Sequence, residues 1–286
     1  MPVASASVKC VAEPFPDRFK PPADDPMTMT IPNAPVTHGA ATCRGDREVW
    51  RDEAGRIRVC TLASAATVEG VAIAADAYTH FHANGVPYQT TIASDRSFKS
   101  GSDVEIPCKG GELVVLSDKG ALDFCTLGKP MVLDGTSCAP GQSVALRPNG
   151  RLHGCTLAEA ISGMGIEIHA GVRVSFHPSG ALASAFRPEQ TIVHGYRVQY
   201  EVEIHENGEL AHITLLEPRT IAAIELPERA EVWMRPDKSV WHIEYVADDG
   251  FMPHGEMWTD TRKVTFDCEQ RIVADVTDHW MAERRR

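Results

Sequence analysis

The sequence predicts an all-β protein: an antiparallel β-meander of about eight β-hairpin repeats of roughly 30 residues, stapled by disulfides. Three observations predict this fold. A turn glycine recurs at nearly constant spacing, apolar residues keep fixed places relative to that glycine, and so do paired cysteines. Helical periodicity is nearly absent, which favours strands joined by tight turns.

A turn marker defines each repeat. Its eight positions are Gly55, Gly85, Gly120, Gly150, Gly180, Gly208, Lys238 and Gln270. The residue six before the marker is usually valine, and the residues four before and two after it are mostly apolar. This pattern predicts a type I turn closed by a residue in the left-handed region, where glycine has no Cβ penalty. With such a loop Leu146 is expected to lie directly opposite Leu152.

A second glycine column lies fifteen residues after the first, at Gly70, Gly135, Gly165 and Gly195. Two turns per repeat predict strands of about ten residues that run alternately up and down. The interval between Gly85 and Gly120 is longer, at 35 residues, which predicts a longer loop near residues 94–102.

The segments Asn149–Gly154 and Asn207–Leu210 resemble units of the MORN-type β-hairpin repeat proteins. The resemblance covers residues 45–245. It implies a hairpin-repeat architecture of the kind that serves mainly as a scaffold or binding surface.

Six of the eight cysteines form three pairs with equal spacing: Cys43 with Cys60, Cys108 with Cys125, and Cys138 with Cys155. One member of each pair lies twelve residues before its turn marker and the other lies five after it. Where one of these two columns lacks cysteine, the other lacks it too, so we expect three disulfides within repeats. Each would constrain the unfolded chain by about 3 kcal/mol.

Three alternatives stay open for these cysteines. A metal site would need converging ligands, usually as C-x-x-C pairs, and the chain has none. Six buried thiols could fill apolar columns, or Cys125 could pair with Cys138 across neighbouring repeats. The remaining two cysteines, Cys10 and Cys268, either bridge to each other or are free thiols.

Disulfides imply an oxidising compartment, so we expect an extracytoplasmic protein, periplasmic or secreted. The first 17 residues lack an apolar signal core, so the signal peptide is expected to be absent from this chain. No apolar run reaches the length of a transmembrane helix. The formal net charge of -11 argues against a nucleic-acid partner, because such partners need clustered Lys and Arg.

The chain is expected to have three parts. Residues 1–42 form a proline-rich, extended N-terminal arm. Residues 43–246 form the β-hairpin repeat domain, and residues 247–286 add an irregular loop, a capping hairpin and a C-terminal tail. The chain lacks a G-x-S-x-G elbow, an H-E-x-x-H motif, a phosphate loop and a dinucleotide fingerprint. We therefore expect a non-catalytic structural or partner-binding module without a cofactor.

Four histidines suggest a metal-binding alternative. His82, His177 and His205 share one place, three before the turn marker, and His80 lies two residues from His82 on one strand face. The competing interpretation is that polar side chains commonly begin type I turns, since other polar residues fill the same place in other repeats.

An exported hydrolase or lyase acting on polysaccharide or cell-wall material is the alternative function. Its acidic site would lie near residues 248–260, with Asp248, His254 and Glu256 as candidate catalytic residues. A possible binding surface consists of the tryptophans Trp50, Trp233, Trp241 and Trp258. The expected partner is protein or carbohydrate at an exposed sheet face, and unpaired end strands make a homo-oligomer feasible.

Overall fold

The structure is a computed structural model that describes residues 27–163, 166–186, 191–251 and 257–281. Within these ranges it contains β-strands and no helix, so no helix of membrane-spanning length occurs there, and the all-β prediction is confirmed. The described residues divide into two compact units. We call residues 27–161 with 169–182 the N-terminal unit, and residues 162–168 with 183–281 the C-terminal unit.

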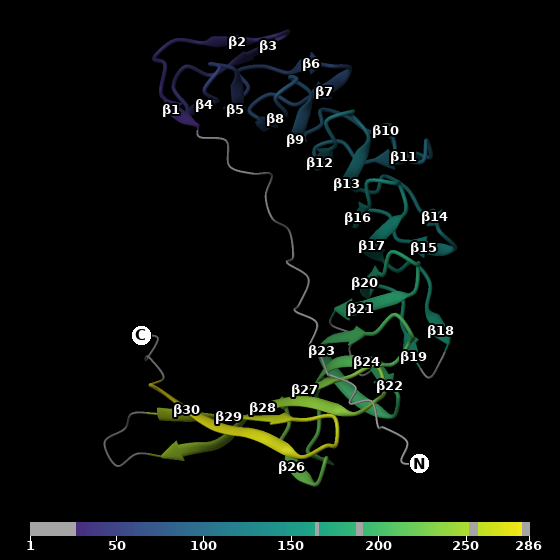
Figure 1. Cartoon of the computed structure of the whole chain (residues 1–286). Coiled ribbons are helices and arrows are strands. Elements are labelled where there is room, and N and C mark those ends of the chain that lie inside the picture. The colour runs from purple at the N-terminus through teal and green to yellow at the C-terminus, as the bar shows by residue number, and fades with distance from the viewer. Residues whose placement is uncertain (1–26, 164–165, 187–190, 252–256, 282–286) are drawn as a thin grey trace, which may run out of the picture. The chain divides into compact units, whose positions relative to one another are not determined.

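Within each unit the repeats contribute their main hairpins to an antiparallel ladder, which we call the main sheet. In the N-terminal unit the main strands are β4 (Val49–Arg51), β5 (Ile57–Thr61), β8 (Tyr78–Phe81), β9 (Pro87–Thr91), β12 (Leu113–Leu116), β13 (Leu122–Thr126), β16 (Ser143–Leu146), β17 (Leu152–Thr156) and β20 (Arg173–Phe176). The second strand of each hairpin pairs with the first strand of the next, and β1 (Thr28–Thr30) pairs with β4. The successive hairpins of this unit follow one another in Figure 1.

A small hairpin precedes each main hairpin. In the N-terminal unit these are β2 (Val36–His38) with β3 (Ala41–Cys43), β6 (Ala66–Val68) with β7 (Val71–Ile73), β10 (Arg96–Lys99) with β11 (Glu105–Cys108), and β14 (Met131–Leu133) with β15 (Thr136–Cys138). The next strand is β18 (Ile161–Gly163). The small hairpins cover one face of the main sheet, and the core lies between the two layers, with Leu62, Ile106 and Leu127 fully buried there.

The C-terminal unit has the same plan with longer strands. Its strands are β19 (Ile166–Ile168), β21 (Leu182–Phe186), β22 (Thr191–Val193), β23 (Tyr196–Ile204), β24 (Leu210–Leu215), β25 (Arg219–Ile221), β26 (Ile224–Leu226), β27 (Glu231–Met234), β28 (Val240–Phe251), β29 (Met257–Phe266) and β30 (Ile272–Met281). Strands β24, β27, β28, β29 and β30 pair in that order, and the small hairpin β25–β26 precedes β27.

The predicted main turn is confirmed in detail. In the β16–β17 hairpin, Gly150 N donates to Arg147 O at 2.7 Å, and Arg147 N donates to Arg151 O at 2.8 Å. Gly150 has a φ of 78°, and Leu146 lies opposite Leu152 beside a β-bulge, as expected for this loop. Lys238 and Gln270 adopt the same left-handed conformation, with φ of 72° and 60°.

The predicted strand length is wrong for most of the chain. The main strands of the N-terminal unit have three to five residues, and among the described strands only β28, β29 and β30 reach ten or more. In five of the described repeats a third turn, nine residues before the marker, ends the extended chain between the small hairpin and the main hairpin, whereas β23 runs on through this place. At one such corner Gly141 has a φ of 68° and donates from its N to Leu127 O at 2.7 Å.

The three predicted disulfides are present, with Cα–Cα distances of 5.8 Å for Cys43–Cys60, 5.9 Å for Cys108–Cys125 and 5.9 Å for Cys138–Cys155. The metal, free-thiol and Cys125–Cys138 alternatives are therefore wrong for these six residues. Each bond joins the end of a small hairpin to a main strand and so fastens the two layers of one repeat. Cys10 lies outside the described residues, so its bridge to Cys268 stays a prediction.

The longer interval before Gly120 is taken up by the loop between β10 and β11, at residues 100–104. This loop packs directly on the main turn of the β16–β17 hairpin. A Cβ added to Gly101 would lie 2.1 Å from Pro148 O, and a Cβ added to Gly150 would lie 2.3 Å from Ser102 N. Both glycines are thus required by close backbone approach.

Candidate binding surface

The main sheet has an outer face, which points away from the small hairpins. In the C-terminal unit the inward residues Ile213, Val232, Ile243 and Val264 are fully buried, so the alternate residues of the same strands face outward. On β24, β27, β28 and β29 the cross-strand register places His212, Trp233, His242 and Thr265 in one row. A second row beside it contains Thr214, Glu231, Glu244 and Lys263.

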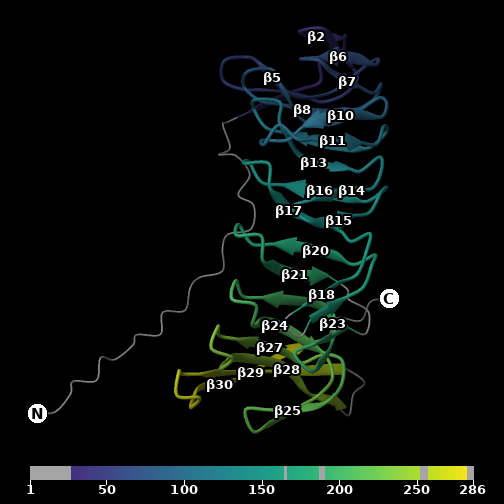
Figure 2. The same ribbon diagram turned by 90° about the vertical axis from the view of Figure 1, so that its right-hand side faces the viewer.

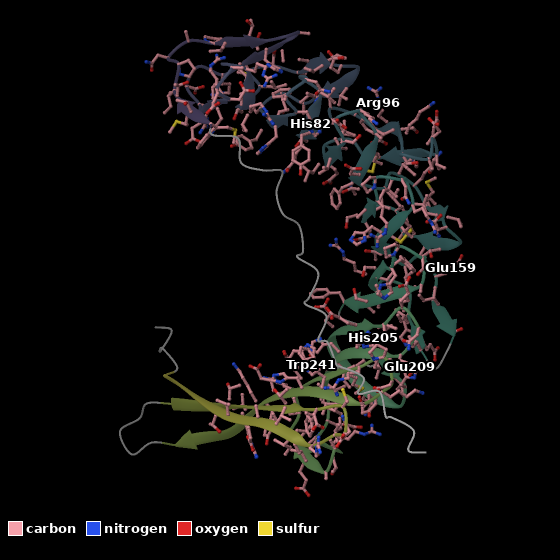
Figure 3. All side chains as sticks on the ribbon, viewed as in Figure 1. His82, Arg96, Glu159, His205, Glu209 and Trp241 are labelled. Carbon is pink, nitrogen blue, oxygen red and sulfur yellow. A yellow bond between two sulfur atoms is a disulfide. The ribbon has the colours of Figure 1, made fainter. Side chains whose placement is uncertain are left out.

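Trp233 is flanked by two imidazole rings. Its ring centroid lies 4.5 Å from that of His212, with an angle of 18° between the planes, which is a stacked arrangement. On the neighbouring strand His242 lies 5.2 Å away and is tilted by 50°. Trp241, labelled in Figure 3, lies 6.1 Å from His242. We call His212, Glu231, Trp233, Trp241, His242 and Glu244 the Trp–His strip.

Two carboxylates lie beside these rings. Glu231 and Glu244 are directly opposite each other on β27 and β28, and their side chains are 45% and 37% exposed. Each is close to an imidazole: Glu231 Oε2 lies 3.9 Å from His212 Nε2, and Glu244 Oε2 lies 4.0 Å from His242 Nε2. Like charges directly opposite each other destabilise a sheet.

The half-buried setting shifts the pKa values of Glu231 and His242. Burial, with the charge of Glu244 as a second cause, raises the pKa of Glu231 above its usual value. Burial lowers the pKa of His242, against a smaller opposing effect of Glu244. His242 Nδ1 also shares a hydrogen bond of 3.0 Å with Thr265 Oγ1. The strip therefore offers hydrogen-bond acceptors and aromatic surface side by side on an open sheet face.

Substituting Glu231→Gln is expected to stabilise the protein at pH 7 by about 0.3–0.5 kcal/mol, allowing for solvent screening of the Glu231–Glu244 repulsion. Because the folded-state pKa of Glu231 is raised, ionisation of its carboxyl group lowers stability increasingly as the pH rises from the unfolded-state pKa to the folded-state pKa, and fully above it. The gain should therefore vanish below the ordinary glutamate value of 4.5. Thermal unfolding at both pH values measures this. The exposed Glu225→Gln in the same unit is the control, and an equal gain there would contradict the assignment to charge repulsion.

Two of the histidines that lie three residues before the turn marker, His82 and His205, hydrogen-bond to backbone carbonyl groups. Nε2 of His82 donates to Leu116 O at 2.9 Å, and Nε2 of His205 donates to Met234 O at 2.8 Å. In each case the accepting carbonyl belongs to the residue that lies four positions before the turn marker of the next repeat. Arg235 fills the same place and donates from Nη2 to Phe266 O at 2.7 Å. Figure 3 labels His82 and His205 at their turns.

A metal site at the predicted histidines gains no support. Among the described residues no group of three or more His, Cys, Asp or Glu side chains is placed to hold a metal ion. His80 lies on the outer face of β8, with its ring 5.1 Å from that of Tyr78. Burial lowers the pKa of His80. His177 occupies the same turn position as His205 in its own repeat.

The tryptophans of the predicted binding surface come from both units. Trp233 and Trp241 belong to the Trp–His strip, whereas Trp50 lies on β4 of the N-terminal unit, opposite Met29 of β1 and Val59 of β5. Trp50 Nε1 donates to Glu48 Oε2 at 3.3 Å. Trp258 lies on β29 opposite Gly250, and its side chain is outside the described part of the structure.

The predicted acidic site falls largely outside the described residues. His254 and Glu256 lie there, and Asp248 is described only as a residue of β28 whose backbone is opposite Asp260. The hydrolase or lyase alternative, with these three residues as its catalytic group, stays a prediction.

Sequence reasoning missed His212, Glu231, His242 and Glu244. A signal for them exists: His212 and His242 each lie four residues after a turn marker, and Trp233 lies five before one. The register joins exactly these columns across neighbouring strands, once the pairing order of the strands is known. No protein-family model matches this chain, and no curated protein matches it either.

Proposed function

We propose that this chain is a non-catalytic, exported β-repeat protein that acts as a partner-binding module, with the Trp–His strip as its binding surface. The observation that carries the proposal is Trp233 flanked by His212 and His242 on an outer sheet face, beside two half-exposed carboxylates. Amphipathic aromatic side chains are the most frequent energetic centres of binding surfaces. Three disulfides agree with export to an oxidising compartment.

The partner class is carbohydrate or protein. Carboxylates and imidazoles accept hydrogen bonds from sugar hydroxyls or from peptide and side-chain N–H groups, and indole rings supply apolar contact area to either. The resemblance to MORN-type hairpin repeats supports the same role, because a stacked array presents an extended surface. We propose that homo-oligomers form through an end strand, and β30 is the candidate. Its apolar residues Ile272, Val273 and Val276 are 51%, 61% and 51% exposed.

Substituting Trp233→Ala is expected to weaken partner binding at least tenfold, because truncating a central aromatic residue removes its contact area. Affinity electrophoresis through gels that contain neutral or acidic polysaccharides tests the carbohydrate arm. Selection from a displayed peptide library tests the protein arm. Trp50→Ala, in the other unit, is the matched control and should bind as the parent protein does.

The polysaccharide experiment and the peptide-library experiment distinguish the two partner classes. Retardation in a polysaccharide gel that Trp233→Ala abolishes would support a carbohydrate partner, and a peptide consensus that Trp233→Ala no longer binds would support a protein partner. Binding that is equally strong in Trp233→Ala, or no binding in either arm, would overturn the assignment of this surface.

A further inference from the structure

A second feature of the outer face lies in the N-terminal unit, on strands β16, β17 and β20, which are neighbours in Figure 2. There the cross-strand register places Ala145, Gly154 and Ser175 in one row. Gly154 has no room for a side chain, since an added Cβ would lie 2.6 Å from Val174 O. Three consecutive strands thus carry little side-chain bulk in this row, and we call Ala145, Gly154 and Ser175 the floor.

Three side chains with nitrogen donors lie beside this floor. Arg147 comes from the end of β16, His153 from β17 and Arg173 from β20. Arg147 donates from Nη2 to Phe176 O, which fixes its guanidinium over the sheet. Within the described residues neither arginine has a carboxylate within ion-pair distance. The described part of the chain therefore places no carboxylate that would neutralise the positive charge here.

Two buried nitrogens at the same place lack hydrogen-bond partners: Nε of Arg147 and Nδ1 of His153. A buried polar atom without a partner costs roughly 1–3 kcal/mol, so a pair of them in one hairpin calls for an explanation. Burial is the first cause that lowers the pKa of His153, followed by the charges of Arg147 and Arg173. The charges of both arginines thus lower the pKa of the imidazole. A negative charge between the three side chains would offset this mutual repulsion.

We infer that Arg147, His153 and Arg173 form a binding site for an oxyanionic group, a carboxylate or a sulfate, seated over the floor of Ala145, Gly154 and Ser175. Guanidinium groups bind such oxygens with charge-assisted hydrogen bonds and planar geometry. The neighbouring hydroxyl residues Ser143 and Thr156 lie on the same strands and face. The site is in the other unit from the Trp–His strip, so this inference does not depend on the proposed function.

The oxyanion has two possible sources, a free inorganic anion or an anionic group on a saccharide. Phe124 of β13 lies opposite Ala145 and places an aromatic ring beside the floor, which favours a sugar ring that carries the charge. Sodium sulfate and an oligogalacturonate are the two probes. A saccharide that binds at least tenfold more tightly than sulfate identifies the sugar-borne group, and equal affinities identify the free anion.

Isothermal titration of the full chain at low salt measures the affinities, and the imidazole NMR signals of His153 locate the site. We expect one bound anion per chain, a shift of the His153 signals, and at least tenfold weaker binding for Arg173→Gln. His153→Gln provides a second variant that leaves both arginines in place. Lys129→Gln removes the same charge from an exposed position outside the site and should bind like the parent protein.

Three outcomes would overturn the inference. The parent protein could bind neither probe, or both Arg173→Gln and His153→Gln could bind as tightly as the parent. Equal weakening by Lys129→Gln would show that the probes respond only to overall charge.

Discussion

Replacing both members of the Cys108–Cys125 disulfide by alanine is expected to lower the free energy of unfolding by about 3 kcal/mol, since the bond closes a loop with a sequence separation of 17. The two cysteines are 1% and 0% exposed, and the bond fastens a small hairpin to the main sheet in the middle of the N-terminal unit. Urea denaturation of the variant and the parent protein measures the difference.

The other two disulfides provide the matched comparison. Cys43–Cys60 and Cys138–Cys155 close loops of the same length, so their removal should cost a similar amount. Titration of free thiols in the denatured, unreduced protein should find two or fewer among the eight cysteines. A loss below 1 kcal/mol for each pair, or eight reactive thiols, would contradict the role of the disulfides.

Substituting Gly150→Ala is expected to destabilise the protein by about 3 kcal/mol or more, well above the effect of Gly120→Ala. Both glycines have left-handed φ values, 78° and 77°, so both substitutions carry about 1–2 kcal/mol of backbone strain. Only at Gly150 would the new Cβ also meet Ser102 N, at 2.3 Å, whereas nothing lies within 4 Å of the Cβ position at Gly120.

Urea denaturation of the two variants separates strain from steric overlap. The difference between them reports the packing of the 100–104 loop on the β16–β17 turn. Equal losses would show that the loop moves aside without cost and that the contact contributes nothing to stability.

The hairpin register could be predicted from the sequence because it depends on local chemistry. A type I turn closed by a left-handed residue fixes which residues face each other, so Leu146 opposite Leu152 followed from the position of Gly150. The disulfides followed for the same reason, since both columns keep a constant offset from that turn. The third turn was not predicted, because Asp76 and Arg229 occupy it in some repeats and glycine in others.

The binding surfaces depend on contacts between repeats, which no single repeat specifies. Trp233 could be recognised as an exposed aromatic residue, but its neighbours His212 and His242 come from the repeats on either side and require the strand order. For the histidines three residues before the turn marker, the sequence suggested a site that the structure does not support. Their shared position suggested a ligand set, yet His82 and His205 bond to carbonyl groups of the next turn.

The described disulfides all lie within single repeats, and none of them joins one repeat to the next. Neighbouring repeats are held together by strand pairing, apolar packing and turn-to-carbonyl hydrogen bonds such as that of His205. Reduction of Cys108–Cys125 therefore removes the covalent closure of one repeat, while the following repeat keeps its own bond, Cys138–Cys155. The change would stay local to that repeat, because in such an array each repeat contacts mainly its direct neighbours.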